Sequence, residues 1–466
     1  MTTFATHHRP QGPTAPMSSP SGPATRRPRT LSERGLVAIV VSGAIAVLAL
    51  WWHDTTMLPG LGEWVTAAGR IAGLLGGYTI VIALLLMCRG PWIDHGLGTD
   101  RLSRWHAMSG RFLIGLLSAH AVLIIWGYSL TSGTGLMAQT NLMLVAVPNV
   151  LLAVIGYGLL VLVGGLSARQ VRKRVDYETW YLVHLLTYIA IGLSFLHVLS
   201  AGADFQAGWA KALWISMYAG VAGLLLWYRW LNPVRNAVHH HPQVDRVTVE
   251  GPGVVSIVIT GRAFDRLEAQ AGQFFRWRFL TPSGWWQSHP YSLSAAPTDS
   301  ELRITVKGLG RHSAELAALT PGTRVLMEGP YGALTTHRRR NGGVLLLAGG
   351  IGITPLRAML EHLHREGPAT GPATLIYRGR TAADLVHRAE IDLLARADHI
   401  DVHYGLGDPG GADDVFVDAR LADLVPDLDR RDVFLCGPAP FMDAATACLL
   451  RCGVPLRHIH AERFEF

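Results

Sequence analysis

The sequence predicts three structural parts in order: a bundle of six membrane-spanning helices, a small antiparallel β-barrel, and an α/β domain built on a parallel sheet. The 466-residue chain is apolar overall, with a mean hydropathy of +0.26 and only 16% charged residues, which is unlike an ordinary soluble enzyme. Its long apolar runs are confined to residues 35–231. Residues 240–466 have a soluble composition, in which short alternating segments come first and apolar strands alternating with helical segments come later.

Six segments of the first half are long and apolar enough to cross a bilayer, which takes about 20 residues of helix. These predicted spans cover residues 35–52, 70–88, 106–127, 145–167, 179–199 and 209–231. Arginine and lysine gather before the first span and after the second and fourth, whereas the loop at 128–141 has no charge. By the positive-inside rule, we expect a multi-pass protein of the cell membrane with both termini in the cytoplasm, whose third and fifth spans run in the same direction.

The domain boundaries follow from these patterns. Residues 1–33 are rich in Pro, Ser and Thr and contain no apolar run, which predicts a disordered tail rather than a cleavable signal peptide. We expect the transmembrane domain at residues 34–231, the β-barrel domain at 240–335 and the α/β domain at 342–466.

The charge and the cysteines narrow the function classes. The net charge of +7 comes from basic residues that cluster beside the apolar spans, so membrane lipid, rather than nucleic acid, is the expected partner. The four cysteines do not form the ladder that a disulfide framework or a four-cysteine iron–sulfur cluster requires.

Two of the predicted spans each contain a pair of histidines, which are costly inside a membrane and normally have a partner or a function. His106 and His120 lie 14 residues apart, and His184 and His197 lie 13 residues apart, so each pair is separated by about 20 Å along its helix. Because the two spans run in the same direction, His106 matches the depth of His184, and His120 that of His197. Two such pairs suit two stacked bis-histidine haems, one near each membrane face. Four hydrogen-bonded histidines in a polar bundle are the alternative.

The angles around the two helices are less regular. A separation of 14 residues returns to within about 40° of the start, whereas 13 residues end about 140° away. The fifth span is therefore expected to bend, or to carry a bulge, near Thr187, Gly192 or Ser194.

Two arginines are further candidates for binding. Arg111 lies just over one turn beyond His106 and suits a propionate of the inner haem. Arg70 opens the second span on the outer side, where it suits an outer propionate or a bound anion. The alternative for Arg70 is a snorkelling residue at the interface.

The segment HPYSLSAAP (289–297) ends a predicted strand beside a tryptophan-rich loop. An aromatic residue followed by a hydroxyl, here Tyr291 and Ser292, can cover a flat ring and donate a hydrogen bond to a ring nitrogen. In GLGRHSAELAAL (308–319), a glycine-rich turn leads into a helix whose free N–H groups suit a pyrophosphate. An ordinary helix capped by Ser313 is the alternative for that turn.

The segment LLLAGGIGITPLRAML (345–360) has the pattern of a buried strand, a glycine-rich turn and a helix, which lets a backbone approach a dinucleotide diphosphate. The next strand ends at Arg378 and Arg380, where the ribose of a nucleotide would lie. Arginine there suits a 2′-phosphate and favours NADPH over NADH, although both side chains also fit as solvated residues. The segment FLCGPAPFMDAA (434–445) puts Cys436 at the carboxyl edge of the sheet, either at a ligand or as a buried structural cysteine.

In this order, the motifs resemble those of the ferric reductase and NADPH oxidase superfamily, in its bacterial form without calcium-binding domains, over about residues 35–466. The resemblance rests on the two histidine spacings, HPYS, GGIGITP, LCGPAPFM and a terminal aromatic residue. In that family the histidines ligate two b-type haems, which implies His106 with His184 for the inner iron and His120 with His197 for the outer iron. The resemblance further implies His289, Pro290, Tyr291, Ser292, Gly310, Ser313 and Phe466 for FAD, and Gly349, Gly350, Gly352, Thr354, Pro355, Arg378, Arg380, Cys436, Gly437 and Pro438 for NADPH.

The resemblance places four of these residues at the reacting rings, namely Tyr291, Ser292, Cys436 and Phe466. Phe466 looks like the family's terminal aromatic on the flavin ring, which must move for the nicotinamide to stack. Arg70, in the span that Cys88 and Arg89 close, resembles the outer arginine near the oxidases' oxygen site. Where some oxidases carry a further histidine, this chain has Ile124, which argues against efficient oxygen reduction at the outer haem.

The function implied by the resemblance is that of an enzyme, an NAD(P)H oxidase or ferric-reductase-like oxidoreductase. Electrons would pass from NADPH through FAD and two b-type haems to an acceptor on the outer side, either oxygen, giving superoxide, or ferric ion. Electron donation to an external protein or quinone partner is the alternative. A non-enzymatic haem-binding membrane protein is a remote one, against which the intact nucleotide motifs argue.

Overall fold

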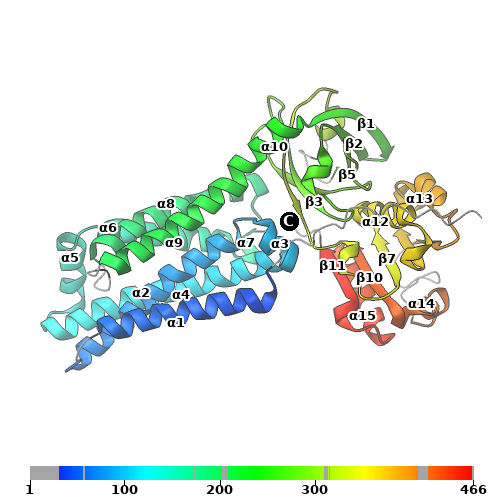
Figure 1. Ribbon diagram of the computed structural model, residues 1–466. Helices are drawn as coiled ribbons and strands as arrows, with labels where there is room; N and C mark the ends of the chain where they lie inside the picture. The colour runs from blue at the N-terminus through cyan, green and yellow to red at the C-terminus, as the bar shows by residue number, and fades with distance from the viewer. Residues whose placement is uncertain are drawn as a thin grey trace, which may run out of the picture.

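The computed structural model describes residues 31–55, 58–172, 174–201, 205, 208–308, 313, 315–407 and 418–463. Figure 1 shows long helices at one end of the molecule and the β-containing domains at the other. Most of the expected disordered tail and two predicted binding residues, Gly310 and Phe466, lie outside the described residues.

Five helices in the described part of the chain are long and apolar enough to cross a membrane. They are α1 (Glu33–Asp54), α2 (Leu61–Leu86), α4 (Thr99–Ser132), α8 (Tyr177–Ala201) and the run of α9 (Gly208–Leu226), a π-helical turn (Trp227–Leu231) and α10 (Asn232–His240). Two short helices, α3 (Pro91–Leu97) and α7 (Arg169–Arg172), lie between them.

The predicted fourth span is instead a bent pair of helices. It consists of α5 (Leu136–Ala146) and α6 (Val150–Leu166), which meet at an angle of 107° and count as a sixth span only if taken together. Pro148 lacks a backbone donor, and Asn149 has a positive φ of 61°, so one continuous helix cannot pass through this point.

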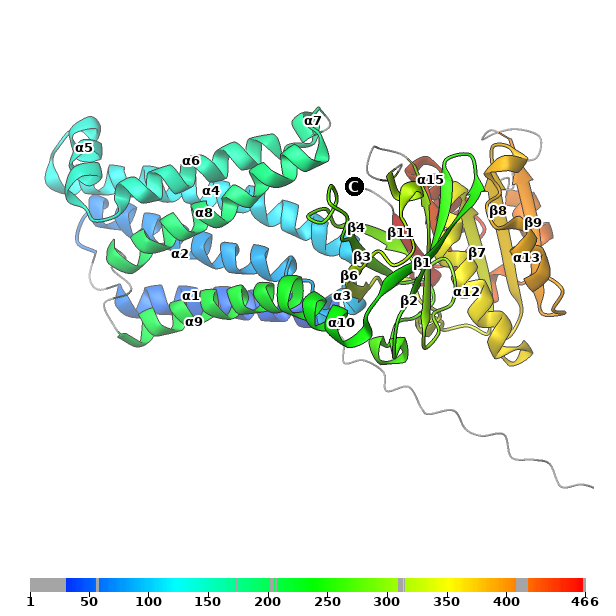
Figure 2. The same ribbon diagram turned by 90° about the horizontal axis from the view of Figure 1, so that it is seen from above.

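The long helices pack as two close pairs, α2 along α4 and α6 along α8 (Figure 2). Small residues allow the close approach. A side-chain carbon at Gly69 would lie 3.0 Å from Ile124 on α4, and one at Gly156 would lie 2.6 Å from the Ser194 hydroxyl on α8. By contrast, α4 and α8 make little close backbone contact with each other. The four predicted haem ligands therefore lie on the two helices that border the looser boundary of the bundle.

The middle of the chain forms two three-stranded antiparallel sheets, with the orders β1-β2-β5 and β4-β3-β6. The strands are β1 (Gln243–Gly251), β2 (Val254–Thr260), β3 (Phe274–Phe279), β4 (His289–Ser292), β5 (Glu301–Lys307) and β6 (Val325–Tyr331). Alternate side chains, such as Ile257 and Ile259 of β2 and Phe275 and Trp277 of β3, are fully buried in one shared core. Two isolated β-bridges join the sheets.

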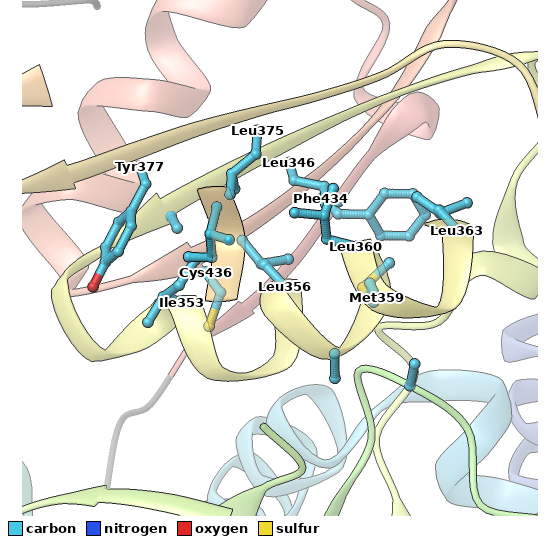
Figure 3. Close-up of a cluster of buried hydrophobic side chains, with 14 of the residues drawn as sticks. Leu346, Ile353, Leu356, Met359, Leu360, Leu363, Leu375, Tyr377, Phe434 and Cys436 are labelled. Atoms are coloured by element: carbon cyan, nitrogen blue, oxygen red, sulfur yellow. The ribbon is translucent and has the colours of Figure 1, made fainter. Parts of the chain in front are cut away.

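The last part of the chain is the predicted α/β domain, with a parallel sheet of order β11-β10-β7-β8-β9. The strands are β7 (Gly343–Gly349), β8 (Ala373–Gly379), β9 (Ile400–Leu406), β10 (Arg431–Gly437) and β11 (Ile459–Arg463), and the helices are α12 (Ile353–Glu366), α13 (Arg388–Leu394), α14 (Asp418–Leu424) and α15 (Ala439–Arg451). In Figure 3, Leu356 and Leu360 of α12 pack on Leu346 and Phe434 of the sheet. The strand order reverses between β7 and β10, so their carboxyl ends mark the crevice where open α/β sheets bind ligands.

Candidate functional site

The backbone of α2 holds both predicted haem ligands of α4. The Nδ1 atom of His106 lies 3.0 Å from the carbonyl oxygen of Ala83, and Nδ1 of His120 lies 2.8 Å from that of Gly69. A carbonyl oxygen only accepts, so each Nδ1 carries a hydrogen and each Nε2 keeps its lone pair. This is the form in which an imidazole binds a metal ion while its other nitrogen is held by an outer hydrogen bond.

His184 of α8 lies opposite His106. The two ring centres are 6.0 Å apart, and the ring planes are inclined at 66°. A metal ion bound at about 2 Å from one nitrogen of each ring leaves the ring centres about 6 Å apart, so the separation fits an ion between them. No group of three or more His, Cys, Asp or Glu side chains able to hold a metal ion occurs in the part of the chain that the structure describes.

The two α8 histidines differ from those of α4 in their hydrogen bonding. Within the described residues, the Nδ1 atoms of His184 and His197 are buried and make no hydrogen bond, although the Pro148 backbone lies within hydrogen-bonding reach of the His197 imidazole. The alternative of four hydrogen-bonded histidines in a polar bundle therefore lacks a partner for Nδ1 of His184, while three of the four imidazoles have a backbone partner. A buried ring nitrogen normally has a partner, which for these Nδ1 atoms would be a water molecule, while the other ring nitrogen can bind a metal ion.

Of the bend or bulge predicted between the α8 histidines, the bulge does not occur. Helix α8 is continuous from Tyr177 to Ala201. A π-helical turn occurs instead at Trp227–Leu231, beyond α9. Within α8, the Thr187 hydroxyl donates to the His184 carbonyl at 2.7 Å, a contact that bends helices without breaking them.

Around the outer histidine of α4, the fit is close. A side-chain carbon at Gly73 would lie 2.6 Å from Nδ1 of His120, so glycine leaves the space that this ring occupies. Helix α2 begins at Leu61, so the prediction that Arg70 opens the second span is wrong: Arg70 is half-buried within α2, next to Gly69, whose carbonyl holds His120. Arg111 is exposed on α4, five residues beyond His106.

The HPYS motif forms β4 at the edge of its sheet. Ser292 is buried and lies in register with Phe274 of β3. Tyr291 is half-buried, and its carbonyl accepts a hydrogen bond from the Trp277 indole at 3.0 Å. Burial raises the pKa of the Tyr291 phenol, so the group stays a neutral donor. The rings of His289 and Tyr291 stack on one face of the strand, with centres 6.5 Å apart.

A partly buried polar network that could not be predicted from the sequence joins the antiparallel sheets to the α/β domain. Arg303 of β5 donates to both carboxylate oxygens of Glu390 on α13, at 2.9 and 2.8 Å, and Arg357 of α12 reaches the same carboxylate at 2.6 Å. Both guanidinium groups also donate to the Ser294 carbonyl, two residues after HPYS. Burial alone would raise the pKa of Glu390, but hydrogen bonds from His387 and Arg303 and the charges of both arginines hold it below its usual range.

The glycine-rich turn lies between β7 and α12, at the crevice. A side-chain carbon at Gly349 would lie 2.9 Å from the Phe441 ring, and one at Gly352 would collide with the Cys436 carbonyl. Gly350 has a positive φ of 53°. These positions therefore require glycine for packing, and the turn brings backbone N–H groups to the carboxyl edge of the sheet.

The residues that follow the turn are buried in the first turn of α12. The Thr354 hydroxyl donates to the Ile351 carbonyl at 3.1 Å, and Pro355 packs beside it. The Thr354 hydrogen bond therefore ties the glycine-rich turn to the first turn of α12.

Two titratable groups, the Cys436 thiol and the Glu462 carboxyl, lie at the ends of neighbouring strands. Cys436 is fully buried at the end of β10 and lies in parallel register with Glu462 of β11. Burial raises the pKa of the Cys436 thiol well above its usual value, and burial also raises that of the Glu462 carboxyl. Gly437 and Pro438 follow Cys436 and lead into α15.

A cavity of about 230 Å³ opens beside the glycine-rich turn, between the two β-containing domains. Its lining includes Lys307, Gly350, Thr381 and Asp384. Arg378 is half-buried at the end of β8, where it donates to the Gly407 carbonyl at 3.4 Å, and Arg380 is exposed just beyond. The structure thus brings the glycine-rich turn and both predicted arginines to the same edge of the sheet. Ser313 is half-buried, and Gly310 lies outside the described residues.

Three family models match the chain in succession. The model described as ferric reductase like transmembrane component matches residues 72–195. The model described as FAD-binding domain matches residues 239–335, and the model described as oxidoreductase NAD-binding domain matches residues 346–447.

Known relatives match the second half of the chain. The ferredoxin reductase component of 3-ketosteroid-9-alpha-monooxygenase from Mycolicibacterium smegmatis is 32% identical over 234 residues, which cover 48% of this chain and 65% of the relative. Ferredoxin–NADP reductase B from Sorangium cellulosum is 30% identical over 42% of this chain and 85% of its own length. The chain spans about half the length of other curated relatives that it matches. Among solved structures, the FAD/NAD-binding domain of nitric oxide dioxygenase from Vibrio cholerae is 26% identical, with a TM-score of 0.42, over 48% of this chain and 97% of that one.

Proposed function

The chain belongs to the ferric reductase and NADPH oxidase superfamily and is a membrane NAD(P)H oxidoreductase, and on this premise we propose that it carries electrons from NADPH through FAD and two b-type haems to an acceptor on the outer face. The haems supply one-electron carriers when bound. The observation that carries the proposal is the 6.0 Å separation of the His106 and His184 rings across the looser boundary of the bundle.

The histidines of α4 and α8 hold the two irons in this proposal. His106 and His184 bind the inner iron, and His120 and His197 bind the outer one. The Ala83 and Gly69 carbonyls support it, because they fix the α4 imidazoles with Nε2 available for a metal ion. Arg111 and Arg70 are assigned to the inner and outer propionates, respectively.

The two antiparallel sheets form the halves of a small barrel that binds FAD. Tyr291 covers the flavin ring, and Ser292 donates a hydrogen bond to a ring nitrogen, with His289 and Pro290 completing the contact. Gly310 and Ser313 receive the pyrophosphate at a helix N-terminus, and Phe466 covers the ring from the other side until the nicotinamide arrives.

NADPH binds along the carboxyl edge of the parallel sheet. The glycines of the turn let its diphosphate approach the backbone, and the 230 Å³ cavity beside Gly350 supports this placement. Arg378 and Arg380 bind the 2′-phosphate and so select NADPH over NADH. Cys436, Gly437 and Pro438 border the nicotinamide. Cys436 is neutral there, which keeps a negative charge away from the hydride.

Both termini are placed in the cytoplasm, so electrons move outward to oxygen or to ferric ion. The neighbourhood of Ile124 favours ferric ion. Its side chain packs at Gly69, whose carbonyl holds His120, so the outer ligand has an apolar neighbour rather than a proton donor for reduced oxygen. Electron donation to an external protein or quinone partner is the second candidate.

The test is an anaerobic spectrum of the protein, purified in detergent with FAD and mixed with NADPH. Bands of reduced low-spin bis-histidine haem are expected only when FAD is present, and His120→Ala and His197→Ala should each remove one haem. Admitting oxygen and then a ferric chelate ranks the acceptors by the rate of haem reoxidation. Wild-type protein without haem bands would mean that the histidines are structural.

A further inference from the structure

The segment between α2 and α4 makes charged and polar contacts with the sheet that carries the flavin motif. The Arg89 guanidinium donates to the Glu328 carboxylate of β6 at 2.6 Å, and Glu328 is 6% exposed. The Asp94 carboxylate of α3 accepts the backbone N–H of Gly332 at 2.8 Å and is itself 3% exposed. Next to it, a ring nitrogen of His95 lies 2.9 Å from the Pro330 carbonyl. Figure 1 shows α3 at the junction of the helical and β-containing parts.

The opposite face of α3 is anchored in the membrane bundle. Ile93 and Leu97 are buried in one apolar cluster with Leu36 of α1 and Leu102 of α4. The backbone N–H of Leu31 also donates to the Trp92 carbonyl at 2.7 Å. Helix α3 therefore packs its apolar side chains into the helical bundle and makes its polar contacts with β6 and the residue that follows it.

The polar contacts connect the two electron-transfer sites through a short covalent and hydrogen-bonded route. Asp94 also accepts the Thr99 hydroxyl at 2.6 Å, and Thr99 begins α4, two turns or about 10 Å before His106. In the antiparallel sheet, Gly332 directly follows Tyr331 of β6. Phe274 of β3 pairs with Tyr331 on one side and with Ser292 of the flavin motif on the other. Strand β3 thus lies between β6, which ends next to Gly332, and β4, which carries the predicted flavin-binding Ser292.

We propose that Arg89, Asp94 and His95, with Glu328, Pro330 and Gly332, form an α3 clasp that positions the flavin site against the inner histidine pair. This inference rests on the proposed function. The step that the clasp positions is the transfer of one electron from reduced FAD to a ferric haem, whose iron becomes ferrous. After two such transfers FAD is oxidised again, and the proton that came with the hydride has left to the cytoplasm.

The clasp is built to be rigid and specific. The carboxylates of Asp94 and Glu328 are almost fully buried, so each requires its partner, and removing one partner leaves a buried group unsatisfied. Arg338, in the connection from β6 to β7, donates to the His95 and Gly96 carbonyls at 3.2 and 2.8 Å and adds a third attachment. The rate of electron transfer falls as donor and acceptor move apart, so loss of the clasp should slow the transfer step.

The experiment uses full-length protein with FAD and haem, mixed anaerobically with NADPH in a stopped-flow instrument that follows flavin and haem absorbance separately. In Asp94→Ala and Arg89→Glu, flavin reduction should stay within about twofold of wild type, and haem reduction should slow by clearly more than twofold. Asp94→Asn should retain most of the rate, because the amide oxygen still accepts from Gly332 and the amide nitrogen can donate to Thr99. The charge-swapped pair Arg89→Glu with Glu328→Arg should recover much of the rate lost in Arg89→Glu.

The control is Glu33→Gln, which removes the exposed ion pair between Glu33 and Arg101 on the same end of the bundle and should change neither rate. Haem reduction within twofold of wild type in both Asp94→Ala and Arg89→Glu would overturn the clasp, and so would an equal loss of flavin reduction. Hydrogen exchange gives a readout without haem: the Gly332 amide should exchange slowly in wild type and faster in Asp94→Ala. If wild-type protein binds no haem, the proposed function fails, while a fast Gly332 amide in wild type separately rejects the clasp.

Discussion

Gly73→Ala should remove the outer haem while leaving the inner one. The added carbon would lie 2.6 Å from Nδ1 and 2.8 Å from Cε1 of His120, far inside van der Waals contact. The ring cannot retreat without stretching its 2.8 Å hydrogen bond to the Gly69 carbonyl, which fixes the tautomer. Overpacking of this kind costs about 1–3 kcal/mol, which corresponds to a loss of about 5- to 150-fold in affinity for the outer haem.

The assay is the haem content per protein of purified Gly73→Ala, measured together with the spectrum after reduction by NADPH. Wild type should hold two haems, and the variant close to one, with the remaining haem still reducible because His106 and His184 are untouched. Gly158→Ala on α6 is the matched control, since Gly158 is exposed and a side-chain carbon there would meet nothing within 4 Å. Two haems of unchanged spectrum in Gly73→Ala would refute the assignment of His120 as an iron ligand held by α2.

Three further predictions concern the β-containing domains. Replacing Arg378 and Arg380 together by Gln should raise KM for NADPH by at least about 10-fold and leave KM for NADH within twofold, and equal changes in both would reject 2′-phosphate binding. Because the pKa of Glu390 is lower in the folded protein than in the unfolded chain, its stabilising effect is present above about pH 4.3 and is lost as the pH falls through the folded-state pKa. The melting temperature of the wild type should therefore fall below pH 4.3 more steeply than that of Glu390→Gln, and parallel curves would contradict the role of the Arg303–Arg357 network. Since burial raises the pKa of the fully buried Cys436, iodoacetamide should modify the half-exposed Cys452 first, as peptide mass spectrometry would show, and early labelling of Cys436 would contradict its buried position.

The regular parts of the fold could be predicted from the sequence because they follow from local patterns. Apolar runs of the right length predict the long helices, and alternating segments predict the strands of both antiparallel sheets. The break at Pro148 and Asn149 was not expected within the fourth span, because a hydropathy window does not register one residue with positive φ. The expected bulge in α8 was wrong for a related reason: the angular argument assumed straight, ideal helices and a fixed side-chain direction.

The contacts that join the domains could not be predicted, because they link residues far apart in the chain. Arg303 and Glu390 are separated by 87 positions, and Arg89 and Glu328 by 239. Nothing in their local sequence distinguishes them from solvated charges. Their role appears only when folding buries the carboxylate of Glu328 to 6% exposure, where an unpaired charge would be costly.

The histidines of α4 and those of α8, which form the two halves of the proposed haem site, differ in their hydrogen bonds to the rest of the protein. The α2 backbone already holds His106 and His120 in the form that binds metal, whereas the buried Nδ1 atoms of His184 and His197 make no hydrogen bond over the described residues. The α2–α4 half of the proposed site is therefore preformed by the α2 backbone, and the Nδ1 atoms of α8 have no such support. The α3 clasp attaches the flavin-motif sheet to the start of α4, through Thr99 and Asp94, and so to the preformed half. In the proposed function, the distance between the flavin site and the inner histidine pair would then be set by the α2–α4 side of the bundle.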